Sequence, residues 1–132
     1  YVYSNVAYQC AKLPEKERAH LAHWIFELEY GHFQIPKPDI SIFLDVPLSF
    51  TREKLDEKRT GKTRDYLKGK KDIHETNLPF QKEVRNVYLE ISKTDPAFII
   101  LDCADQGGRM KAAEEIHEQI IHILNTKKIS IV

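Results

Sequence analysis

Hydrophobic positions in the first 30 residues recur with the period of an α-helix. In residues 1–13 one side carries Val2, Val6, Cys10 and Leu13. In residues 14–30 a second stripe comprises Leu21, Trp24, Ile25 and Leu28, between Pro14, which suits a first helical position, and Gly31. The pattern predicts two amphipathic helices, each with one face in the core.

Two later segments have the nearly continuous apolar character of strands that are covered on both faces. Residues 39–46 read DISIFLDV, and residues 97–101 read AFIIL before Asp102. We expect one helix to open at Pro47, a second to begin at Asn77 and end before Pro96, and a third to cover 109–125. The expected inward positions of the last two are Phe80, Val84, Val87, Tyr88, Ile91, Ala113, Ile116, Ile120 and Leu124. The tail KKISIV either adds a third short strand or trails.

Strands that alternate with amphipathic helices predict an α/β fold with a parallel sheet flanked by helices. A chain of 132 residues suits a single domain. Two strands, however, are too few for such a sheet, because their edges and apolar faces would be uncovered. We therefore expect residues 1–132 to be the C-terminal part of one larger domain, or the missing strands to come from elsewhere.

Composition indicates which kinds of partner and which cellular compartment the sequence favours. Lys and Arg together number 20, as do Asp and Glu, so no overall charge attracts the chain to nucleic acid or to a membrane. Cys10 and Cys103 lie far apart without metal-type spacing, which favours a reduced cytosolic protein. We expect Cys103, at the end of a predicted strand, to be structural and neither cysteine to be catalytic. No apolar run approaches the roughly 20 residues of a membrane span. We expect a soluble intracellular protein without a metal site of its own.

The other face of the first predicted helix is polar. Ser4, Asn5, Tyr8 and Gln9 fall at i, i+1, i+4 and i+5, so a hydroxyl, two amides and a phenol lie side by side. Such a set can hydrogen-bond the edge of a flat polar ring and stack on it. The alternative is a solvated helix face.

A basic segment follows the third predicted helix. KRTGKTRDYLKGKK, residues 58–71, holds seven basic residues and one acidic residue, with few apolar anchors, which predicts a mobile connection. A basic lid that closes on phosphates is one interpretation, and a solvated connection is the other. Its Gly-Lys-Thr lacks the first glycine of G-x-x-x-x-G-K-[ST] and a preceding strand, so it is not a phosphate loop. Residues 72–75, Asp-Ile-His-Glu, extend the lid-like segment to 58–75.

Taken in order, these landmarks resemble the C-terminal two-thirds of thymidylate kinase. The most specific are SNVAYQ, PKPDISIFLDVP, the following basic segment and DIHE. The resemblance implies a P-loop nucleoside-monophosphate kinase fold and transfer of the γ-phosphoryl group of ATP, with Mg²⁺, to dTMP. It also implies a cytoplasmic homodimer.

The resemblance assigns roles residue by residue. The dTMP-facing helix corresponds to Ser4, Asn5, Tyr8 and Gln9, with Tyr8 near the sugar. The stretch that closes over dTMP corresponds to Asp72, His74 and Glu75, although a tyrosine is common where this chain has His74. The candidate catalytic residues of the lid correspond to Arg59 and Arg64.

The family's phosphate loop and its Asp-Arg pair have no counterpart in residues 1–132, so we expect these residues alone not to turn over dTMP. Two alternatives to a dTMP kinase stay open. One is a related deoxynucleotide or deoxynucleoside kinase with another base. The other is a non-catalytic remnant of the fold that serves dimerisation or nucleotide binding.

Overall fold

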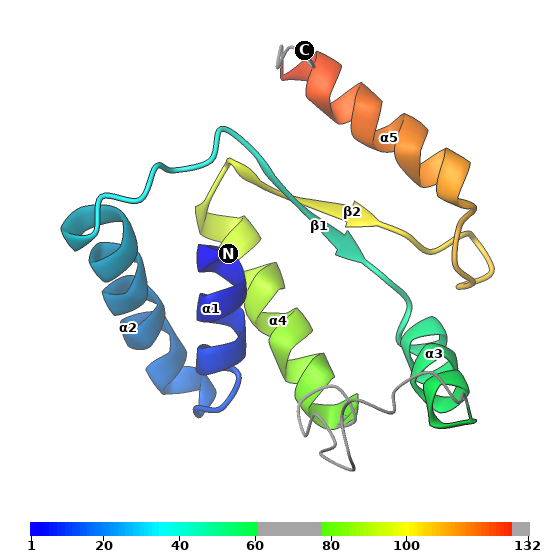
Figure 1. Ribbon diagram of the computed structural model, residues 1–132, viewed down its shortest axis with the longest axis horizontal. Coiled ribbons are helices and arrows are strands. Elements are labelled where there is room, and N and C mark those ends of the chain that lie inside the picture. Colours follow the sequence, from blue (N-terminus) through cyan, green and yellow to red (C-terminus); the bar gives the residue numbers. More distant parts are fainter. Residues whose placement is uncertain (61–77, 128–132) are drawn as a thin grey trace.

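The computed structural model describes residues 1–60 and 78–127, without the side chains of residues 55–60. Figure 1 shows the arrangement of the helices around a short pair of strands. The elements are α1 (Val2–Cys10), α2 (Glu15–Phe26), the π-helical segment η1 (Glu27–His32), β1 (Ser41–Asp45), α3 (Leu48–Thr60), α4 (Leu78–Thr94), β2 (Phe98–Asp102) and α5 (Ala113–Thr126). The expected order of helices and strands is confirmed.

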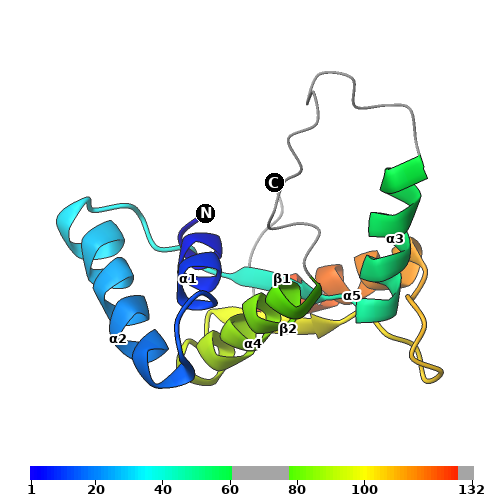
Figure 2. The ribbon, with the colours of Figure 1, turned by 90° about the horizontal axis from the view of Figure 1, so that it is seen from below.

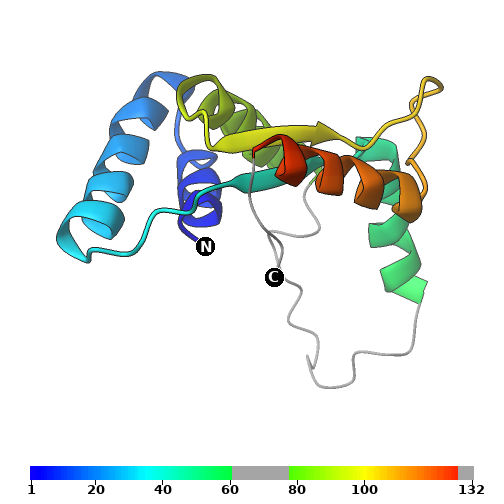
Figure 3. The same cartoon turned by 90° about the horizontal axis from the view of Figure 1, so that it is seen from above.

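The two strands pair in parallel, as the alternation of strands and helices predicts. Ser41 faces Phe98 at one end of the register, and Asp45 faces Asp102 at the other. Both strands therefore end at the same side of the sheet, each with an aspartate. Figures 2 and 3 show α4 and α5 on opposite faces of this sheet, which gives a three-layer α/β arrangement.

The larger core lies between α1, α2, α4 and the sheet. Val6, Ala7 and Cys10 of α1 are fully buried, and Val84 and Ile91 of α4 pack in the same cluster. Aromatic rings extend this core onto the sheet. The ring centroids of Tyr3 and Phe98 lie 4.7 Å apart, and the ring centroids of Phe43 and Tyr88 lie 4.3 Å apart. The inward faces predicted for α1 and α4 are thus confirmed.

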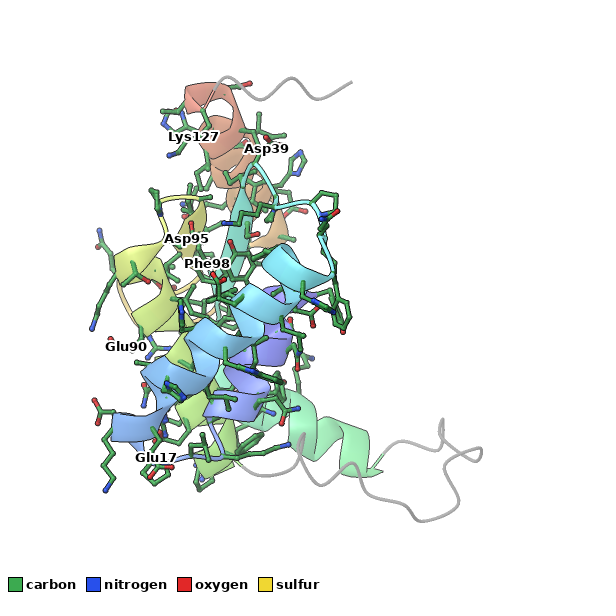
Figure 4. The ribbon with its side chains drawn as sticks, turned by 90° about the vertical axis from the view of Figure 1, so that its left-hand side faces the viewer. Glu17, Asp39, Glu90, Asp95, Phe98 and Lys127 are labelled. Atoms are coloured by element: carbon green, nitrogen blue, oxygen red, sulfur yellow. The ribbon has the colours of Figure 1, made fainter. Side chains whose placement is uncertain are left out.

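A turn of the chain at Asp95 closes this core between α4 and β2. The Asp95 carboxylate accepts hydrogen bonds from the Tyr3 hydroxyl at 2.6 Å and from the Ala97 amide at 2.9 Å. The Asp95 carbonyl accepts a third from the Phe98 amide at 3.0 Å. Figure 4 shows Asp95 and Phe98 close together at this turn.

The second, smaller core lies between the sheet and α5. It joins Leu101 and Cys103 to Ile116, with Ile120 and Ile123 packed against them. The helix begins at Ala113 and not at residue 109, because residues 105–109 form a tight turn. In that turn the Asp105 carboxylate accepts hydrogen bonds from the amides of Gly107 and Arg109 at 2.8 and 2.9 Å. Ala113 is consequently exposed, and its predicted inward position is wrong.

The stripe predicted for α2 is wrong at Trp24, which is 56% exposed. The face that packs on α1 is instead formed by Leu21, Ala22, Ile25 and Phe26. The same face continues into η1, where Glu29 occupies the position four residues after Ile25 and is 6% exposed. Trp24 therefore lies outside the face of α2 that contacts α1.

The sheet is less covered than the apolar strand sequences predict. All β1 residues are at least partly exposed, and Leu44 is 40% exposed. Only two strands occur among the described residues. None of the described helices is both long and apolar enough to cross a membrane.

Candidate functional site

The polar face predicted for α1 exists and is turned away from the core. Val2, Tyr3, Val6, Ala7 and Cys10 are the buried residues of the helix. The polar side chains on the other face are Ser4 and Gln9, which are exposed, and Asn5 and Tyr8, which are half-buried. The structure therefore brings these four side chains together on one accessible surface.

Ser4 and Tyr8 border α4. The Tyr88 hydroxyl donates a hydrogen bond to Ser4 Oγ at 3.2 Å. The Tyr8 ring meets the Phe80 ring edge to face, with centroids 6.0 Å apart. Burial raises the pKa of the Tyr88 phenol, so Tyr88 stays protonated at neutral pH and can donate to Ser4. These contacts hold one edge of the polar face in place.

Asn5 and Gln9 make different contacts. Asn5 Nδ2 donates to the buried Glu29 carboxylate of η1 at 3.2 Å. Gln9 Oε1 accepts from Lys12 Nζ at 3.3 Å in an exposed position. The amide of Asn5 is thus held by a buried partner, whereas that of Gln9 lies at the surface.

A cavity of about 250 Å³ lies beside Tyr8, at the carboxyl end of β1. Its polar lining comes from Tyr8, Asp45, Thr51, Gln81, Arg85 and Tyr88. In open α/β sheets, ligands bind outside the carboxyl ends of the strands. Of the four residues of the polar face, Tyr8 lines this cavity, whereas Ser4 lines a second cavity together with Ser41 at the start of β1.

A two-pronged ion pair joins β1 to α4 at the same cavity. Arg85 Nε and one of its terminal nitrogens donate to the two carboxylate oxygens of Asp45 at 2.5 and 2.6 Å. The Asp45 side chain is 12% exposed and that of Arg85 is 36% exposed. Hydrogen bonding to Asp45 raises the pKa of the Arg85 guanidinium, despite an opposing effect of burial. The pair holds the end of β1, from which the chain continues to α3, against α4.

Neither cysteine is placed to react. Cys10 and Cys103 are both buried and free, and burial raises the pKa of each thiol. A raised pKa reduces the thiolate form, which is the reactive one. This agrees with the structural role expected for Cys103.

The residues assigned to the lid are not tested. Arg59 belongs by its backbone to the last turn of α3, and its side chain is not described. Arg64, Asp72, His74 and Glu75 lie outside the described residues, as do most of the lid-like segment 58–75 and the tail 128–132. Among the residues that the structure describes, no group of three His, Cys, Asp or Glu side chains is placed to hold a metal ion.

The sequence pattern did not identify Glu29 or the Asp45–Arg85 pair as parts of the site. Glu29 had a usable signal, because it continues the buried stripe four residues after Ile25. The ion pair had none, since residues 45 and 85 are brought together only by the packing of α4 on the sheet.

Comparison with known proteins gives consistent matches. The family model for thymidylate kinase matches residues 1–128. A thymidylate kinase of Mycobacterium tuberculosis (strain CDC 1551 / Oshkosh) is 29% identical over 92 residues, 70% of this chain and 41% of the relative. A thymidylate kinase of Fervidobacterium nodosum is 33% identical over 88 residues, 67% of this chain and 36% of the relative. No solved structure matches significantly.

In these alignments the chain spans about two fifths of the length of the curated relatives. The family match nevertheless extends over almost all of its own residues, including the polar face of α1, both strands and the following helices. The chain belongs to the thymidylate kinase family.

Proposed function

We propose that the protein containing this chain transfers the γ-phosphoryl group of ATP to dTMP, and that the polar face of α1 contributes to the dTMP site. The family match over residues 1–128 carries this proposal. It is supported by the four polar side chains that share one accessible face of α1, of which Tyr8 lines the cavity at the carboxyl end of β1.

In this proposal the amides of Asn5 and Gln9 hydrogen-bond the edge of the thymine ring, because thymine presents both a donor and acceptors there. Ser4 and Tyr8 lie next to them, with the Tyr8 phenol directed to the sugar. Tyr8 is suited to this role because the edge contact with Phe80 restricts its ring. These residues bind and orient the acceptor nucleotide, and do not take part in the chemical step.

The chemical step depends on charge. Phosphoryl transfer is accelerated mainly by positioning the groups and by stabilising negative charge on the transferred phosphoryl oxygens. We assign that role to the lid arginines Arg59 and Arg64, while Asp72, His74 and Glu75 close over dTMP. Mg²⁺ would enter with ATP, since this ion commonly binds through substrate phosphates and retains several waters. Residence in the cytoplasm and a homodimeric state are further parts of the proposal.

Steady-state kinetics test the assignment, with protein expressed from the complete reading frame that encodes this chain. Asn5→Ala or Gln9→Ala should raise KM for dTMP about 5- to 150-fold, because loss of one partner leaves a buried group unpaired at about 1–3 kcal/mol. KM for ATP should stay nearly unchanged. Arg64→Ala should instead lower kcat more than it weakens dTMP binding, because its charge acts on the transition state.

Lys16→Ala is the matched control for these variants, because Lys16 is exposed on α2 and does not belong to the polar face of α1. It should leave both KM values unchanged. Phosphorylation of another deoxynucleotide in preference to dTMP would support the related kinase, and no phosphorylation at all would support the non-catalytic alternative. Wild-type behaviour of both helix variants toward dTMP would show that the polar face is only solvated.

A further inference from the structure

Glu29 is the only buried charged side chain among the described residues whose side chains can be judged. It lies in η1, where the Phe33 amide donates to the Leu28 carbonyl five residues earlier, as in a π-helix. A buried charge costs free energy unless hydrogen bonds compensate it. Glu29 therefore needs a donor, and Asn5 of α1 supplies one at 3.2 Å.

The chemistry of this contact determines which end of the Asn5 amide faces Glu29. An ionised carboxylate only accepts hydrogen bonds, whereas a side-chain amide has a donating NH₂ end and an accepting oxygen end. The NH₂ end must consequently point to Glu29. This leaves Asn5 Oδ1, an acceptor, as the end of the amide that is available to a ligand.

An acceptor held in this way distinguishes pyrimidines. Thymine and uracil carry a hydrogen on ring nitrogen N3, whereas N3 of cytosine is itself an acceptor. A fixed acceptor would bond to N3–H of the first two bases and would face a second lone pair in cytosine. Gln9 differs from Asn5, because its amide and its partner Lys12 both lie at the surface, where the contact restricts the amide less.

We propose that Glu29 is a positioning residue that orients the Asn5 amide, so that the site selects a pyrimidine nucleotide with a hydrogen on N3. This inference rests on the proposed function. Glu29 itself touches no substrate in this proposal and acts only through Asn5.

The test compares dTMP, dUMP and dCMP with protein from the complete reading frame, by kcat/KM and by the dissociation constant of each nucleotide. Wild-type protein should prefer dTMP to dCMP strongly. Glu29→Gln keeps the size of the side chain but can donate as well as accept, so the Asn5 amide can turn. The preference for dTMP over dCMP should then fall by about tenfold, as expected when the one hydrogen bond that distinguishes the two bases is lost.

Four comparisons separate orientation from structural damage. Glu27→Gln, in the same segment but exposed, should leave the preference unchanged. Glu29→Asp retains a carboxylate acceptor and should keep the preference even where activity falls. In an Asn5→Ala background, Glu29→Gln should have no further effect on the preference, because the residue it orients is gone. The ratio of dTMP to dUMP should not respond to Glu29→Gln in any background.

An unchanged dTMP/dCMP preference in folded Glu29→Gln protein would overturn the inference. Where that variant does not fold, wild-type protein that binds dCMP as tightly as dTMP would overturn it as well, and so would Glu29→Asp protein that loses the preference. Failure of the proposed function is distinguishable. It would appear as absence of phosphoryl transfer, while the dissociation constants would still report whether the site selects among bases.

Discussion

Tyr3 illustrates how one side chain can serve both the core and a turn. Its ring packs on Phe98, and its hydroxyl donates to Asp95 at 2.6 Å. Burial, followed by the hydrogen bond to Asp95 and the charge of that carboxylate, raises the pKa of Tyr3 above its ordinary value. The residue therefore ties the start of α1 to the turn between α4 and β2.

Tyr3→Phe should lower the free energy of unfolding by about 1–2 kcal/mol at pH 7, because it removes the donor and leaves Asp95 with one partner fewer. Urea unfolding of the variant and of wild type measures the difference. Tyr1→Phe is the matched control, because Tyr1 is 85% exposed and should change stability little. Equal stability of Tyr3→Phe and wild type would show that the Asp95 contact adds nothing.

The raised pKa of Tyr3 also predicts that the free energy of unfolding depends on pH. Because the folded pKa of Tyr3 is raised, the unfolded chain ionises first, near its ordinary value of about 10. The stabilisation is complete below that pH and is lost as pH rises toward the folded pKa. Tyr3→Phe should thus flatten the decline of stability above about pH 10 relative to the Tyr1→Phe control. An equally steep decline in both variants would contradict this.

At the scale of the elements, the Asp45–Arg85 pair fixes the position of α4 relative to the carboxyl end of β1. It is bidentate, and Asp45 is largely shielded from water. The exposed Lys93–Glu90 pair of α4 has a similar distance, 2.6 Å, but both side chains are more than half exposed. Shielding and geometry should make the first pair the stronger one.

Double-mutant cycles measure this difference. Asp45→Asn combined with Arg85→Gln should give a coupling of about 1–2 kcal/mol in the free energy of unfolding, after allowance for the partial exposure of Arg85. Glu90→Gln combined with Lys93→Gln should give at most about 0.5 kcal/mol. Added salt should weaken the second coupling more than the first. Equal couplings would contradict the assigned role of the pair.

At the scale of the whole molecule, the thymidylate kinase family has the P-loop NTPase fold, and β1 and β2 form a parallel pair within an α/β architecture. In the part of the chain that the structure describes, the sheet has two strands and is narrow for such an architecture. Leu44 and Leu48, at the end of β1 and the start of α3, are both more than a third exposed.

Purified residues 1–132 should consequently bind a hydrophobic dye and self-associate, because uncovered apolar faces and strand edges favour association. Dye fluorescence and sedimentation velocity, at several protein concentrations, measure both. Leu44→Gln should reduce both signals, whereas Lys16→Gln, at an exposed polar position of α2, should change neither. A monomer with a sharp cooperative melt and no dye binding would contradict the expectation.

Periodicity and side-chain chemistry determined the order of the elements. The helical spacing of Val6, Cys10, Val84 and Ile91 identifies buried faces, because only one side of an amphipathic helix can avoid water. The apolar runs before Asp45 and Asp102 identify parallel strands for a different reason, because such strands are covered on both faces. The spacing of the α1 polar residues likewise placed Ser4, Asn5, Tyr8 and Gln9 on one face. Such properties are local, and each follows from neighbours in the sequence.

Only the tertiary structure decided which of these residues meet. The sequence pattern did not exclude Trp24 from the core, because the rotation of α2 against α1 is set by the fit of two surfaces. Likewise, Glu29 reaches Asn5 and Arg85 reaches Asp45 only after helices and strands have packed. These contacts between distant residues depend on the positions of whole elements, and no pattern within one element encodes them.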